Sequence, residues 1–160
     1  MISINRYLAA GVHRIADVFP EIRQDPVVLE IFGTPQEAAD VLDNTPVALG
    51  DRSRYMSVDN DDGSIRIGCG HLQQSAPEIL YLDIVHELVH VKQHRQGLNL
   101  YDKSVAYVDR PTEVEAYRFT VEVARRIGLS DAQILDYLLV EWITPEEHRR
   151  LAGKLNVTAP

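Results

Sequence analysis

Residues 77–95 read PEILYLDIVHELVHVKQHR and carry the strongest structural signal in the chain. Pro77 and the acidic Glu78 stand at its start, basic residues close it, and Gly97 follows, which are start and stop signals typical of a helix. Apolar residues fall on several sides of this helix. We therefore expect it to cross the hydrophobic core.

The same stretch contains the pentad His86-Glu87-Leu88-Val89-His90. Two histidines four residues apart share one face of a helix, so each imidazole can give one nitrogen to the same zinc ion. Glu87 projects beside them and can take a proton from a metal-activated water without being a ligand. Buried polar groups are costly unless paired, and a metal ion would pair these. The competing interpretation is a chance pair of histidines satisfied by backbone carbonyls.

Composition limits the class of protein. The chain has 160 residues, 45% of them hydrophobic and 25% charged, which predicts one globular domain over residues 1–160. A formal charge of −8 argues against nucleic acid or an anionic membrane as a partner. The single cysteine, Cys69, excludes an internal disulfide, and no apolar run reaches membrane-spanning length. We expect a cytoplasmic protein.

Two helices are predicted in the first quarter of the chain. Apolar residues at helical spacing over residues 3–18 predict an amphipathic helix that ends at Phe19. Thr34 followed by Pro35 is a helix cap with proline at the first helical position, and it predicts a short helix to about Leu42.

A small antiparallel sheet is predicted ahead of the long helix. Residues 54–58 and 64–69 alternate at roughly period two on either side of an acidic turn, residues 59–63, that ends in Asp-Gly. The short apolar run 47–49 adds a further strand. The acidic turn lacks the spacing and closing Glu of a calcium loop, because Gly70 holds the twelfth position, so we expect a solvated hairpin tip.

The predicted elements after the long helix are all helical. Pro111 opens a second long helix that runs to about Ile127 and is stopped by Gly128. Capping-box patterns at residues 130–133 and 144–147 each open a C-terminal helix. The chain therefore reads as helices, a small sheet and then helices, which is an α+β fold.

A catalytic zinc usually takes three protein ligands, so a third must be found. His94 continues the four-residue series but lies about 12 Å along the helix axis from His86, too far to share one ion. The metzincin pattern requires Gly three residues and His six residues after the second ligand. Gln93 and Gln96 occupy those positions, which excludes that pattern.

The start of the second long helix offers two carboxylates, Glu113 and Glu115. Thr112 and Glu115 stand in the Thr-x-x-Glu relation of a capping box, which gives Glu115 a structural role. Glu113 has no such role and would project to a different side of the first turn. We therefore predict Glu113 as the third ligand and keep Glu115 as the alternative.

These residues resemble the gluzincin metallopeptidases, which combine a His-Glu-x-x-His helix with a Glu-x-x-Ala pattern on a later helix. The match covers residues 86–90 and 113–116, and the order of elements extends it to about residues 45–127. Compact gluzincins, including the ImmA/IrrE-like peptidase domains, look similar in size. Tyr117 departs from the acidic or amide residue that some members carry, and Val89 from a frequent glycine.

The resemblance implies a zincin-like fold and a zinc-dependent endopeptidase acting on peptides or proteins. One zinc ion would be held by His86, His90 and Glu113, with Glu87 as general base. The strand at 64–69 would pair its edge with an extended substrate. The alternative functions are a catalytically silent zinc-binding regulatory module and a metal-free structural domain. Attack on the peptide carbonyl produces a tetrahedral oxyanion that commonly requires an additional hydrogen-bond donor. Three tyrosines are candidates for this donor: Tyr101, Tyr107 and Tyr117.

A second motif, Gly68-Cys69-Gly70-His71, does not predict another metal site. One cysteine and one histidine two residues apart are too few ligands, and the chain has no other cysteine. Its glycines instead predict the end of a strand.

Overall fold

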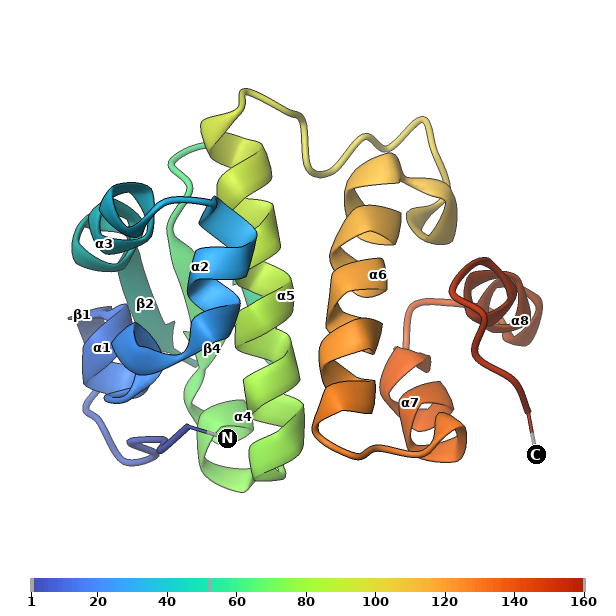
Figure 1. Ribbon diagram of the computed structural model, residues 1–160, viewed down its shortest axis with the longest axis horizontal. Helices are drawn as coiled ribbons and strands as arrows, with labels where there is room; N and C mark the ends of the chain where they lie inside the picture. Colours follow the sequence, from blue (N-terminus) through green and yellow to red (C-terminus); the bar gives the residue numbers. More distant parts are fainter. Residues whose placement is uncertain (1, 52, 160) are drawn as a thin grey trace. The chain divides into compact units, whose positions relative to one another are not determined.

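The computed structural model describes residues 2–51 and 53–159 and divides into two units, Met1–Gly97 and Leu98–Pro160. Eight α-helices and a four-stranded sheet form within the described residues, which confirms the α+β class (Figure 1). None of the helices described is long and apolar enough to cross a membrane.

The first unit contains the sheet, in the order β1-β2-β4-β3. Its strands are β1 (Gly11–Arg14), β2 (Pro46–Gly50), β3 (Met56–Val58) and β4 (Ile65–Gly68). The predicted hairpin is confirmed, since β3 and β4 pair antiparallel and Gly63 at φ +76° closes the turn. The sheet is mixed, however, because β2 pairs parallel with β4. The strand that follows β2 in the sequence, β3, is not its neighbour in the sheet. β4 lies between them, and β3 forms the edge on the other side of β4.

Two predictions about the first unit are wrong. The segment 64–69 is not a sheet edge, because β4 is paired on both sides, with β2 and with β3. The predicted helix over residues 3–18 is also wrong. Residues 11–14 form edge strand β1, antiparallel to β2, and only the single turn α1 (Ile15–Val18) is helical. Pairing with a distant strand overrode the apolar spacing there.

Helix α5 (Pro77–Arg95) lies in the core of the first unit, which confirms the predicted long helix and its core position. Its fully buried residues include Leu80, Ile84 and Leu88. Both α2 and β3 contact α5 (Figure 1). The remaining helices are η1 (Ile22–Gln24), α2 (Pro26–Phe32), α3 (Pro35–Asn44), which bears out the Thr34 cap, and α4 (Cys69–Gln74).

The second unit is helical throughout. It contains η2 (Tyr107–Asp109), α6 (Pro111–Arg126), α7 (Asp131–Leu138) and α8 (Pro145–Lys154). The two predicted capping boxes are confirmed, at Ser130 for α7 and at Thr144 for α8.

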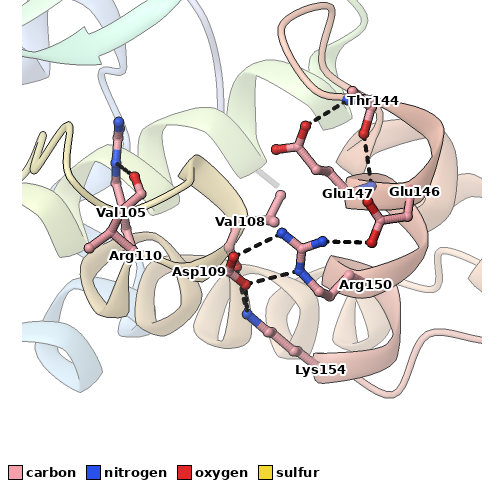
Figure 2. A network of polar contacts seen from close by, with 9 residues as sticks. All are labelled: Val105, Val108, Asp109, Arg110, Thr144, Glu146, Glu147, Arg150 and Lys154. Carbon is pink, nitrogen blue, oxygen red and sulfur yellow. Dashed lines mark hydrogen bonds and ion pairs between the residues drawn. The ribbon is translucent and has the colours of Figure 1, made fainter.

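An ion cluster links η2 to α8 in this unit. Figure 2 shows Arg150 donating two hydrogen bonds to Asp109, at 3.1 and 2.8 Å, while Lys154 binds the same carboxylate and Glu146 accepts from Arg150. The Arg150 guanidinium and then the Lys154 ammonium lower the pKa of Asp109 to about 2.

Candidate metal centre

Helix α5 places His86, Glu87 and His90 inside the protein, at 6%, 7% and 2% exposure. The two imidazole rings stack edge to face, with their centroids 4.7 Å apart and their planes at 83°. The i, i+4 spacing therefore puts both rings on one face of the helix, as predicted. Leu88 and Val89, which stand between the two histidines in the sequence, are buried as well.

Gln93 orients one of these histidines. Its side chain is 1% exposed, and its Oε1 lies 2.7 Å from Nδ1 of His90. A carbonyl oxygen only accepts hydrogen bonds, so Nδ1 carries the proton and Nε2 keeps its lone pair for a metal ion. Sequence reasoning used Gln93 only to reject the metzincin pattern. The signal that could have found it is the i, i+3 spacing from His90, which places the two side chains side by side.

Glu113 lies in the first turn of α6 and is 2% exposed. Glu115, the alternative ligand, is exposed. The structure thus favours Glu113, although the argument that selected it is wrong. Arg110 is the N-cap residue of α6, so Thr112 lies inside the helix and cannot form the predicted capping box. Its hydroxyl donates instead to the carbonyl of Leu100, at 3.2 Å.

His86, His90 and Glu113 form the candidate site. Each offers one ligand atom, and these three atoms all lie within 4.8 Å of one another. The three residues are buried and close enough to bind one metal ion. Two imidazoles and one carboxylate form a donor set that suits zinc and leaves a coordination position open. His94 is not part of the group, which agrees with the prediction that it lies too far along the helix from His86 to share one ion.

Glu87 and His86 carry buried polar atoms that the described part of the chain leaves without a hydrogen bond. These atoms are Oε2 of Glu87 and Nδ1 of His86, although both side chains have other interactions. Burying a polar atom without a hydrogen bond is costly, and such exceptions to core packing occur chiefly at functional sites.

Two of the three candidate oxyanion donors, Tyr107 and Tyr117, contact each other in the second unit. The hydroxyls of Tyr107 and Tyr117 lie 2.7 Å apart, and Tyr117 is buried. The residue that orients His90 is therefore not Tyr117 but Gln93, from α5 itself.

A comparison with known protein families, curated proteins and solved structures found no match to this chain.

Proposed function

We propose that this protein is a zinc-dependent peptidase of the gluzincin type with a zincin-like fold. The observation that carries the proposal is the buried group of His86, His90 and Glu113, with the carboxylate of Glu87 next to one ligand in the same helix. A site that only bound metal would need the three ligands but not Glu87. The proposed reaction is hydrolysis of a peptide bond.

Each residue has a distinct part in this reaction. His86, His90 and Glu113 would hold one zinc ion, and Gln93 keeps Nε2 of His90 available. Zinc, when bound, supplies a Lewis acid that polarises the scissile carbonyl and lowers the pKa of water toward neutrality. The Glu87 carboxylate accepts the proton of the attacking water and delivers it to the leaving amine.

Strand β3 is the best candidate for holding an extended substrate. It forms one edge of the described sheet and packs against α5, the helix that carries the pentad. An extended peptide can add to such an edge through backbone hydrogen bonds. This replaces the earlier assignment of the role to residues 64–69, whose strand is interior.

Zinc content and peptide-library cleavage, measured together, test the proposal. Glu87→Gln is expected to retain zinc and to lose about 100-fold or more in kcat, because it removes the general base. Glu78→Gln, on the same helix, is the matched control and should remain active. Retained activity in Glu87→Gln would refute the assigned mechanism.

A second pair of variants tests the third ligand. Glu113→Gln should weaken zinc binding strongly, whereas Glu115→Gln, which alters an exposed carboxylate of the same helix, should not. Bound zinc without cleavage of any library peptide would instead support a regulatory metal-binding module.

A further inference from the structure

Helices α4 and α5 bring a serine, a histidine and an aspartate together in the first unit, outside the metal-binding group. His71 lies between the other two side chains. Its Nε2 is 2.7 Å from Oδ2 of Asp83, and its Nδ1 is 2.8 Å from Oγ of Ser75. The side chains of His71 and Asp83 are 10% and 20% exposed.

The hydrogen bonds of this cluster have a defined direction. A carboxylate only accepts, so Asp83 holds the proton of His71 on Nε2. In the neutral ring, Nδ1 is then unprotonated and accepts a hydrogen bond from the Ser75 hydroxyl. Hydrogen bonds in this direction activate the serine nucleophile of serine hydrolases. In those enzymes Nδ1 bonds to the carboxylate and Nε2 to the serine, whereas here the two ring nitrogens are exchanged.

The backbone of Ser75 is fixed in place. Its amide donates to the carbonyl of His71 at 3.1 Å, and its carbonyl accepts from the guanidinium of Arg6 at 2.8 Å. The ring of Tyr55 packs edge to face on His71, with the centroids 6.0 Å apart. The hydroxyl and the imidazole are therefore held in one arrangement, which is the condition for proximity effects in catalysis.

A polar cleft adjoins the cluster. Its volume of about 420 Å³ lies in the range of small-molecule sites. Both Ser75 and His71 line it, together with Arg54, whose positive charge can stabilise an oxyanion. The other lining residues are mainly polar: Asp51, Ser53, Tyr55, Gly70 and Gln74.

We propose that Ser75 is a nucleophile toward small, polar carboxylic esters, with His71 as its general base and Asp83 as the residue that orients His71. The Ser75 oxygen attacks the ester carbonyl, and its proton passes to Nδ1 of His71. The bond to the leaving alkoxide breaks as His71 returns that proton to it. Water then hydrolyses the acyl-serine by the same route, which restores the hydroxyl. No metal ion takes part, so this site is independent of the proposed peptidase.

A fluorophosphonate probe tests the proposal on the full chain. Attack by Ser75 forms an oxygen–phosphorus bond and expels fluoride, which leaves a stable label that peptide mass spectrometry can locate. We expect labelling at Ser75, unaffected by a chelator and slowed about tenfold or more by His71→Gln and by Asp83→Asn. Ser75→Ala should lose the label and the hydrolysis of p-nitrophenyl acetate but keep zinc.

Ser104 is the matched control, because its exposed hydroxyl bonds to a carboxylate without a histidine. Ser104→Ala should leave labelling unchanged. Since Ser75 also caps α4, thermal unfolding identifies variants that fail to fold, and mapping of the label on the unaltered chain needs no variant. Absence of label at Ser75, or labelling no faster than at Ser104, would show that the cluster only joins the two helices and would overturn the proposal.

Discussion

Replacing Gln93 with leucine removes the acceptor of the His90 Nδ1–H inside the core. The bond is 2.7 Å long and Gln93 is 1% exposed, so water cannot take the place of the lost oxygen. A buried donor without an acceptor costs about 1–3 kcal/mol. Loss of a histidine's orienting partner typically weakens metal binding by about 10–100-fold, which corresponds to about 1.4–2.7 kcal/mol.

Two measurements separate these effects. Competition with a chromophoric chelator gives the zinc affinity, and thermal unfolding of the metal-free protein gives the cost of the unsatisfied donor. Gln93→Leu should lose affinity and melt roughly 2–10 °C lower. Gln93→Glu should keep or raise the affinity, because a carboxylate accepts from Nδ1–H more strongly. Gln96→Leu, at an exposed position at the end of the same helix, should change neither quantity.

The decisive result is the affinity of Gln93→Leu. If it binds zinc as tightly as Gln96→Leu while melting at a lower temperature, Gln93 contributes only to packing. The assignment of Nε2 of His90 as a ligand atom would then lose its support.

Three further variants test other parts of the structure. Glu87→Leu should raise the free energy of unfolding by about 0.5–2 kcal/mol while abolishing activity, because the carboxylate is buried; urea unfolding that shows a loss would contradict this. Gly68→Ala would place a Cβ 2.2 Å from the backbone oxygen of Ser53 and should cost about 1–3 kcal/mol in the same assay. Asp109 has its pKa lowered from 3.8 to about 2 by Arg150, so its stabilising effect exists above about pH 4 and disappears toward pH 2. The difference in melting temperature between wild type and Asp109→Asn should therefore shrink as pH falls through that window, and a constant difference would refute the linkage.

Local signals predicted most of the elements. The caps at Thr34, Ser130 and Thr144 each satisfy backbone donors within a few residues, so the sequence contains the whole interaction. The Asp-Gly turn before β4 is equally local. Strand β1 was missed because its partner, β2, lies more than thirty residues away, and helical spacing over the same residues pointed elsewhere.

The candidate metal ligands were predicted to different degrees. Spacing within α5 was enough for His86 and His90, since the helix itself places them. Glu113 was predicted from a capping box that does not form, and what distinguishes it from Glu115 is burial, a tertiary property. The cluster of Ser75, His71 and Asp83 could not be predicted, because it depends on how α4 packs against α5.

Helix α5 combines apolar residues that stabilise the core with buried polar residues that reduce its stability. Its leucines and valines make it a core helix that helps hold the first unit together, while four polar side chains are buried among them. Those four, His86, Glu87, His90 and Gln93, replace apolar contacts that would stabilise the fold more. Sequences break the rules of core packing chiefly at functional sites. The hydrogen bond between His90 and Gln93 is an example of such an arrangement. It holds the proton on Nδ1 of His90 and leaves the lone pair of Nε2 for a metal ion. A stability cost concentrated in two turns of one helix is therefore a physical argument for the proposed metal site, to which α5 contributes two of the three candidate ligands.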